Sequence, residues 1–379
     1  MNYKKLAMTQ HKKLRGKIGI ELKDSLDNPD KLSTYYTPGV GAVSKYLAEN
    51  PNEARNYTWL NNSVAVISDG SSVLGLGNIG PQAALPVMEG KCMLFKRFAG
   101  IDAVPIVLNV HKAEDIVSAV MAIAPTFGGI NLEDIAAPIC FEVEKKLKDS
   151  LQMPIMHDDQ HGTAIVVLAG LINSIRLAEK DLNDCRMVVN GVGAAGVAII
   201  KLVKRYAPGI RIIAVDSNGI ITDQRKDLNS TKQELIEKRI IMSNLAGDLS
   251  AAMTDSDIFI GVSRAKTLTR KMVRSMNNKG IIFAMANPEP EILPDDAKKA
   301  GAFIIATGRS DFPNQVNNAL AFPGIFRGAL DNNLKRITLK HKIAAAKAIS
   351  ELVQNPTPEY IIPSVLDKNL VPAITKVIT

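Results

Sequence analysis

The chain consists of short apolar runs of strand length separated by longer segments with helical spacing. The strands expected in the first half are residues 64–68, the centre of 90–100, 103–110 and 153–157. Residues 111–125 carry apolar side chains at helical spacing, and a long apolar helix is expected from Gly162 to about Glu179. The first half therefore predicts a mixture of strands and helices.

The second half has a more regular rhythm. Its expected strands are residues 187–190, 211–215, 257–261, 280–285 and 303–306. Helical stretches separate them, and this alternation predicts a parallel sheet with helices on both faces. We expect an α/β domain over residues 1–160 and a Rossmann-type, doubly wound domain over 161–335. A helical, proline-punctuated tail over 336–379 is expected to pack back on the first domain.

Composition narrows the class of protein. The chain has 379 residues, of which 46% are hydrophobic and 22% charged, which argues against a disordered or fibrous protein. Three widely spaced cysteines exclude a disulfide framework and favour the cytoplasm. The longest apolar run, residues 164–172, is too short to span a membrane, and no apolar segment of a cleaved signal follows the basic N-terminus.

The net charge of +8 raises the question of nucleic acid as a partner. The basic residues are spread along the whole chain, and aromatic residues make up only 5% of it. We therefore expect no nucleic-acid partner and a positive field that attracts small anions.

The pattern GxGxxG occurs twice, and the two copies differ in context. The copy beginning at Gly191 follows an apolar run, precedes a helix and has Asp216 20 residues beyond its last glycine. These are the requirements for binding a dinucleotide, with the pyrophosphate on the helix N-terminus and the acid on the ribose. The copy beginning at Gly75 is followed at once by Pro81, so a tight loop is favoured there over a second dinucleotide site.

Two pairs of acids follow two of the expected strands. Glu133 and Asp134 form one pair and Asp158 and Asp159 the other. If the strand ends share a sheet edge, three carboxylates would suit Mg²⁺ or Mn²⁺, whereas the alternative is that both pairs are exposed loop acids. The two histidines at 157 and 161 suggest zinc only weakly, because a glycine follows and no third soft ligand is near.

Tyr36 and Lys91 gain meaning only if they lie near these acids. Tyr36 stands in a loop predicted over residues 33–41, where a tyrosine is usually a packing residue. Lys91 stands beside a glycine and by itself would be a surface residue. A nearby cation together with burial would lower the pKa of Lys91 towards that of a general base.

Eight sequence blocks in order carry a resemblance to a known family. They are YTPGVG, VLGLGNIGPQAALPVMEGK, FKRFAGIDAVPI, GGINLEDI, HDDQHGTAIVVLAGLIN, NGVGAAG, FAMANPEPEI and TGRSDFPNQVNNALAFPGIFRGAL. Together they resemble the short bacterial malic enzymes, from about residue 10 to the C-terminus. The resemblance implies a substrate and metal domain, a Rossmann-type NAD(P)-binding domain and a homodimer.

The resemblance also implies roles for residues at matching positions. The implied roles are general acid for Tyr36, general base for Lys91, support of the base for Asp158, metal binding for Glu133, Asp134 and Asp159, substrate contact for Asn287 and Asn318, and cofactor binding for Gly191, Gly193, Ala194, Ala195, Gly196, Asp216 and Asn287. Two positions depart from family patterns. Val192 stands where alanine is common, and Ser72 stands where long eukaryotic members carry a substrate-binding arginine.

The implied reaction is the oxidative decarboxylation of L-malate to pyruvate and CO₂. Lys91 would take the proton of the C2 hydroxyl, hydride would pass to the nicotinamide, and Tyr36 would protonate C3 of the enolate. Asp216 favours NAD, while Ser217 and Arg225 leave NADP open. An oxaloacetate decarboxylase without net redox chemistry and a non-catalytic dinucleotide sensor are the alternatives. The expected setting is cytoplasmic, with a small-molecule substrate and no membrane partner.

Overall fold

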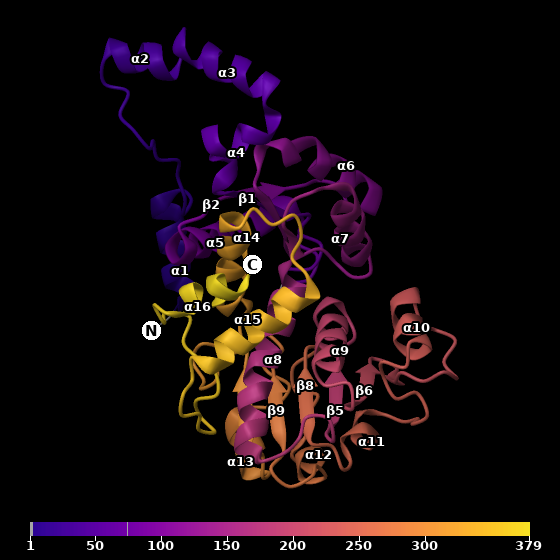
Figure 1. The fold of residues 1–379 in the computed structure, drawn as a ribbon. Helices are drawn as coiled ribbons and strands as arrows, with labels where there is room; N and C mark the ends of the chain where they lie inside the picture. Colours follow the sequence, from indigo (N-terminus) through magenta and orange to yellow (C-terminus); the bar gives the residue numbers. More distant parts are fainter. Residues whose placement is uncertain (1–2, 74) are drawn as a thin grey trace.

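Two sheets organise the molecule (Figure 1), which is described by a computed structural model of residues 3–73 and 75–379. The first sheet has the strand order β2-β1-β3-β4, and all of its strands are parallel. Its strands are β1 (Ser63–Ser68), β2 (Asp102–Val107), β3 (Gly129–Leu132) and β4 (Ile155–His157). Every residue of β1 is buried, which explains why its sequence is a continuous apolar run rather than an alternating one.

The second sheet has the order β10-β9-β8-β5-β6-β7. Its strands are β5 (Arg186–Asn190), β6 (Arg211–Asp216), β7 (Gly219–Ile220), β8 (Ile258–Gly261), β9 (Ile281–Ala284) and β10 (Ile304–Thr307). All pairs are parallel except that of β7, a two-residue strand that the sequence pattern did not predict. Because β5 pairs with both β6 and β8, the strand order reverses there, which in such sheets marks the binding crevice. The predicted α/β fold with a Rossmann-type sheet is confirmed.

Helices cover both sheets. They are α1 (Tyr3–Leu14), α2 (Pro29–Tyr35), α3 (Gly39–Glu49), α4 (Ala54–Tyr57), α5 (Pro81–Ala99), α6 (Ala113–Ile123), α7 (Ile139–Ser150), α8 (Asp158–Ala178), α9 (Ala194–Tyr206), α10 (Ser230–Glu237), α11 (Leu249–Met253), α12 (Arg270–Arg274), α13 (Pro294–Lys299), α14 (Phe322–Asp331), α15 (Leu339–Glu351) and α16 (Leu370–Val377).

The strand expected at the centre of residues 90–100 is wrong, because these residues belong to α5. Met88, Cys92, Phe95 and Ala99 are buried apolar side chains of this helix, and their spacing of three to four residues places them on one helical face. The apolar centre of this segment was therefore one face of a helix.

The long helix α8 connects the two sheets. It begins at Asp158, four residues earlier than the sequence pattern predicted, and ends at Ala178. Its length and composition are those of a membrane-crossing helix, but 67% of its apolar window is buried inside the protein. It packs against α9 and α15, which identifies it as a core helix.

The last helices pack on one another and on α5. Phe95 of α5 contacts the rings of Phe322 and Phe326 at centroid distances of 4.6 and 5.4 Å. Helix α16 packs against α14, and α15 packs against α8. The C-terminal segment is thus part of the main core, in which Ile374 is fully buried.

Helices α2 and α3 form an arm, defined here as residues 29–49, that projects from the rest of the molecule (Figure 1). Neither helix buries a residue. The loop predicted over residues 33–41 is shorter than expected, because α2 ends at Tyr35 and α3 begins at Gly39.

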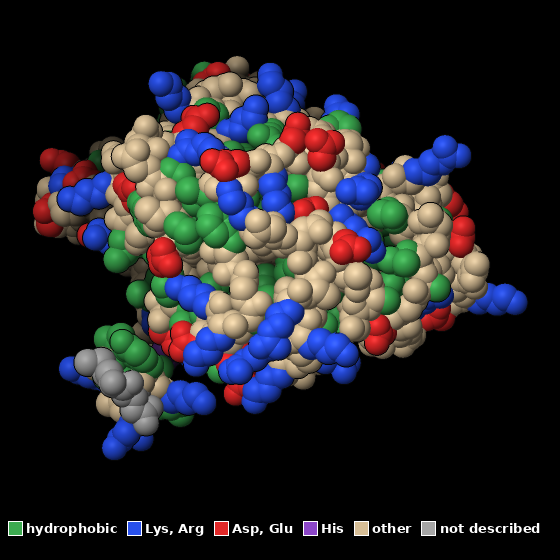
Figure 2. Space-filling model, turned by 90° about the horizontal axis from the view of Figure 1, so that it is seen from below, with side chains coloured by type: hydrophobic (Ala, Val, Ile, Leu, Met, Phe, Trp, Pro, Cys, Tyr) green, Lys and Arg blue, Asp and Glu red, His purple; other side chains and the backbone are tan. Residues whose placement is uncertain are grey.

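The face shown in Figure 2 carries lysine and arginine side chains interspersed with aspartate and glutamate. Apolar side chains lie between them in small groups. The charges on this face are therefore mixed.

Candidate active site

The carboxyl ends of β3 and β4 bring the two acid pairs together. Leu132 and His157, the last residues of these strands, lie opposite each other in the parallel ladder. Glu133 and Asp134 follow the first strand, and Asp158 and Asp159 begin α8 directly after the second. The structure therefore places both pairs at one sheet edge, where Glu133, Asp134 and Asp159 have carboxylate oxygens within 4.8 Å of one another.

Hydrogen bonds from neighbouring groups fix this acid cluster. Asn131 donates to Oε2 of Glu133 at 2.8 Å, and the backbone N–H of Asp134 donates to Oδ2 of Asp159 at 2.8 Å. Burial raises the pKa of Glu133, Asp158 and Asp159, against the lowering effect of Lys91. Burial therefore disfavours the ionised forms of these three acids more than Lys91 favours them.

Lys91 is the cation at the centre of the cluster. It extends from α5, is 7% exposed, and its Nζ lies 2.6 Å from Oδ2 of Asp158 and 2.8 Å from Oε1 of Glu133. The ring of Phe322 lies below it, 4.4 Å from Nζ to the centroid. Burial disfavours the ammonium, but the surrounding carboxylates outweigh burial and raise the pKa of Lys91. Without a further cation, Lys91 is held protonated.

The two histidines differ in their surroundings. Nε2 of His161 lies 2.9 Å from Oε2 of Glu144 on α7, and burial lowers the pKa of His161 to about 3. His157 is fully buried, and neither ring nitrogen has a hydrogen-bond partner within the described residues. His161 is therefore directed towards α7, which agrees with a neutral, hydrogen-bonding histidine.

The predicted dinucleotide loop has the required strand, turn and helix. β5 ends at Asn190, and α9 begins at Ala194 after Gly193. Gly191 adopts φ +106°, and a side chain there would lie 2.6 Å from the carbonyl oxygen of Val262. A side chain at Gly196 would lie 1.9 Å from the carbonyl oxygen of Gly191. Both positions thus require glycine, and Ala194 and Ala195 open α9 where a pyrophosphate would be received.

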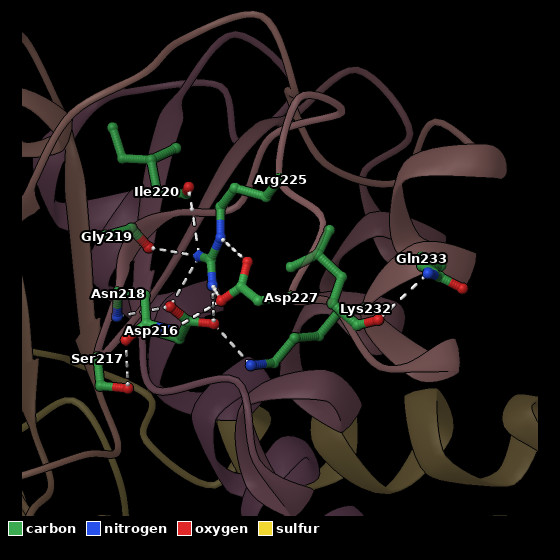
Figure 3. A network of polar contacts seen from close by, with 10 residues as sticks. Asp216, Ser217, Asn218, Gly219, Ile220, Arg225, Asp227, Lys232 and Gln233 are labelled. Atoms are coloured by element: carbon green, nitrogen blue, oxygen red, sulfur yellow. Dashed lines mark hydrogen bonds and ion pairs between the residues drawn. The ribbon is translucent and has the colours of Figure 1, made fainter.

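Asp216, at the end of β6, lies in a network of charges (Figure 3). Arg225 donates to both of its carboxylate oxygens, at 2.8 and 3.1 Å, and Nζ of Lys232 lies 2.6 Å from Oδ2. Arg225 also pairs with Asp227. Burial raises the pKa of Asp216, but these hydrogen bonds outweigh it and lower the pKa. Asp216 is therefore a fixed carboxylate with two cations against it.

Asn287 and Asn318 lie at the meeting of the two halves. Asn287 follows β9, and its carbonyl oxygen would lie 3.0 Å from a side chain at Gly75. The first glycine motif is accordingly a loop that leads into α5 and contacts the second half. Asn318 begins the short helix η4 (Asn318–Leu320), and its Cβ would lie 3.0 Å from a side chain at Gly162 in the first turn of α8.

Tyr36 is the predicted site residue that the chain does not bring to this cluster. It caps α2 on the projecting arm (Figure 1) and is 66% exposed. Within the described residues, the arm helix α2 packs mainly on α3. A single chain therefore assembles Lys91 and the acids without Tyr36.

Two residues at the site were missed from the sequence. Phe322 underlies Lys91 and Asn131 orients Glu133. An apolar residue in a helix carries no chemical signal, whereas Asn131 could have been found as a polar residue inside a buried strand, two positions before a candidate ligand.

Comparison with known proteins identifies the family of the chain. Residues 15–148 match the family model of the malic enzyme N-terminal domain, and residues 160–376 match that of the malic enzyme NAD-binding domain. The chain is 50% identical to the bifunctional malic/malolactic enzyme of Bacillus subtilis over 382 residues, which cover 100% of this chain and 92% of that protein. It is also 50% identical to the NAD-dependent malic enzyme of Geobacillus stearothermophilus, over 96% of this chain and 76% of that one. The crystal structure of NAD-dependent malic enzyme from Thermotoga maritima superposes with a TM-score of 0.94 at 46% identity, covering 98% of both chains.

Proposed function

The chain belongs to the malic enzyme family, and we propose that its acid cluster and Lys91 convert L-malate to pyruvate and CO₂ with reduction of a nicotinamide cofactor. The observation that supports this assignment is the position of Lys91, buried between the acid cluster and Phe322. A base at this position can reach a hydroxyl group held by the same acids.

Glu133, Asp134 and Asp159 are proposed to hold Mg²⁺ or Mn²⁺. Three oxygen donors within 4.8 Å suit a hard divalent cation. Buried Oδ1 of neighbouring Asp158 has no hydrogen-bond partner within the described residues. Burial raises the pKa of Glu133 and of Asp159, and a cation would favour their ionised forms. When bound, the cation would supply charge stabilisation to the C2 oxygen of the substrate.

Lys91 is proposed as the base for the C2 hydroxyl proton. A base must first lose its own proton, and the pKa of Lys91 is raised by the carboxylates around it. A cation bound by Glu133 would remove part of that effect and favour neutral Lys91. Asp158 would keep Nζ in place through its 2.6 Å contact.

The cofactor is proposed to lie over Gly191, Gly193 and the first residues of α9, with NAD preferred to NADP. Asp216 places a carboxylate at the end of β6, where ribose hydroxyls are received, and a 2′-phosphate would be repelled by it. Arg225 and Lys232 partly offset that repulsion. Asn287 and Asn318, which both lie in the second half of the chain, are proposed to contact the substrate. Asn287 is proposed to contact the cofactor as well.

A homodimer is proposed to supply Tyr36, the general acid for C3 of the enolate, from the partner chain. The arm exposes apolar side chains that a single chain leaves uncovered, namely Leu32, Tyr35, Tyr36, Val40, Val43 and Tyr46. Exposed apolar groups at this density favour a protein contact, and exchange of an identical segment is a low-cost route to a dimer.

We propose the domain limits to be residues 1–160 for the substrate and metal domain, 161–335 for the cofactor domain and 336–379 for the tail. The first sheet lies within the first range and the second sheet within the second. We also propose a cytoplasmic location, which three free, buried cysteines support.

The test is a steady-state assay with L-malate, NAD⁺ or NADP⁺, and Mn²⁺, in which reduced cofactor, pyruvate and lactate are all measured. Pyruvate and reduced cofactor are expected in equal amounts, and exhaustive treatment with EDTA should abolish both until Mn²⁺ or Mg²⁺ is restored. Lactate is included because the Bacillus subtilis relative is named a malolactic enzyme. CO₂ released from oxaloacetate with no malate oxidation would favour the decarboxylase instead, and full activity after chelation would contradict the metal site.

A further inference from the structure

A cavity lies between α7, α8, α9 and α10, and none of the acids of the cluster lines it. Its volume is about 820 Å³, and it is lined by residues of α7, α8, α9 and α10 and by the segment that leads into α15. These helices lie around one region in Figure 1. The cavity therefore touches elements that pack on both sheets, and none of the residues assigned above to substrate, metal or cofactor lines it.

Lys342 is the unusual residue of this cavity. It extends from α15, is 7% exposed, and its Nζ makes no hydrogen bond or ion pair in the part of the chain that the structure describes. Burial lowers the pKa of Lys342 to about 7, with Lys148 adding to the effect and Glu144 opposing it. Burial therefore disfavours the ammonium form of Lys342, and an anion placed against Nζ would favour it.

The nearest carboxylate does not serve as this anion, because its oxygens are already engaged. Oε1 of Glu144 accepts a hydrogen bond from the backbone N–H of His157 at 2.9 Å and lies 2.6 Å from Nζ of Lys148. Oε2 lies 2.9 Å from Nε2 of His161. Glu144 is thus compensated by its own partners, and its pKa lies well below its ordinary value although burial opposes this.

The rest of the lining has two kinds of surface. Arg336 lines the cavity and makes no ion pair within the described residues, and Lys145 adds a further positive charge. Lys148 and Lys201 also line it, but they pair with Glu144 and Glu234. Asp149 is the third acid of the lining, so five basic side chains face three acidic ones. Ala164, Val197 and Leu202 provide an apolar wall on α8 and α9. A ligand that satisfies both surfaces has an anionic head and an apolar body.

We propose that this cavity binds a small organic anion, with its phosphate or carboxylate group at Lys342 and Arg336 and its apolar part on the wall formed by Ala164, Val197 and Leu202. The anion would be the negatively charged partner that the amine of Lys342 lacks within the described residues. The ligand contacts helices from both halves of the molecule.

The test is isothermal titration calorimetry on the full-length protein saturated with NAD⁺, with phenyl phosphate and benzoate as probes. Inorganic phosphate lacks the apolar body and benzyl alcohol lacks the charge, so both are expected to bind at least about tenfold more weakly than the better of the two probes. Phenyl phosphate and benzoate distinguish a phosphate site from a carboxylate site.

Two matched variants decide whether the cavity is the site. Lys342→Met keeps the length of the side chain and removes its charge, and should weaken binding of the preferred probe about 10–100-fold, the effect expected for a lost charged hydrogen bond. Lys340→Met makes the same change at an exposed position of the same helix and should leave binding unchanged. Arg336→Gln tests the second cation of the site and should also weaken binding of the preferred probe. Equal binding of the probes to Lys342→Met and the unmodified protein, or no binding to the latter, would overturn the proposal.

Discussion

Lys91 is the residue on which the chemistry of the proposed site depends. Its Nζ lies within 2.8 Å of two carboxylates, so its removal leaves buried negative charges without a partner and the substrate hydroxyl without a base. Lys91→Ala is expected to lower kcat for malate oxidation by about 10²–10⁴-fold, the range of a general base. The measurement is the steady-state rate of cofactor reduction.

Lys96→Ala serves as the control for this prediction. Lys96 lies on the same helix, is mostly exposed and pairs with Asp102 at 2.7 Å, away from the acid cluster. Its substitution should leave kcat within about twofold of the unmodified enzyme, because exposed ion pairs contribute little. Retention of normal turnover by Lys91→Ala would make this lysine a structural counter-ion.

Asp216 is expected to set the preference of the enzyme for NAD⁺ over NADP⁺. Replacing it with serine removes the charge that would repel a 2′-phosphate and frees Arg225 and Lys232 to receive one. Asp216→Ser is therefore expected to narrow or invert the ratio of kcat/KM for NAD⁺ over that for NADP⁺. Asp223→Ser, a change of the same kind in the nearby loop, is the control. An unmodified enzyme that already prefers NADP⁺ would contradict the assignment of Asp216 and point to Arg225 as the phosphate partner.

The sequence predicted the positions of the acids better than it predicted the side chains that surround them. The positions of Glu133 and Asp159 follow from a local rule, since acids that follow neighbouring parallel strands share one sheet edge. Phe322 approaches Lys91 from more than 200 positions away, and no local pattern encodes that contact. Arg225 was expected near the cofactor, whereas the ion pair of Lys232 with Asp216 was not.

Among the elements, α5 shows where periodicity fails. Its apolar centre resembled a strand because a run of a few apolar residues has no period of its own. Pro86 lies inside this helix, where a proline would usually argue against it. The five strands expected in the second half were each located within one or two residues, since buried parallel strands form continuous apolar runs bounded by turns.

The packing of α16 on α14 gives a prediction at the scale of elements. Ile374 is fully buried, and its Cβ would lie 2.6 Å from a side chain at Gly324, so the two helices are in close contact. Ile374→Ala is expected to lower the free energy of unfolding by about 2–5 kcal/mol, through lost burial and a residual cavity.

Urea denaturation followed by circular dichroism measures this loss. Lys376→Ala, on the exposed side of the same helix, should change the free energy of unfolding by less than about 0.5 kcal/mol. Equal midpoints for Ile374→Ala and the unmodified protein would show that the tail contributes little to the core.

For the whole molecule, the arm is what sequence reasoning could not place. The sequence marks Tyr36 as a candidate acid and predicts a loop over residues 33–41. The break between α2 and α3 is shorter than that loop, because Gly39 lies inside α3. No local pattern encodes the direction in which the segment projects. The arm buries none of its residues in one chain, and the second chain of the proposed dimer would cover it.

Tyr36 and Lys91 therefore provide a test of the whole assembly. Tyr36→Phe and Lys91→Ala are each expected to be nearly inactive as homodimers.

If each site takes its lysine from one chain and its tyrosine from the other, a mixed dimer of the two variants contains one site with both groups intact. Random reassociation makes about half of the dimers mixed, so about a quarter of the unmodified activity should return. To isolate the mixed dimers, the two variants are coexpressed with different affinity tags and the doubly tagged dimers are purified. Half of the active sites in these dimers should be functional. A doubly tagged dimer with no activity would show that both residues act within one chain, which requires the arm to fold back onto its own acid cluster.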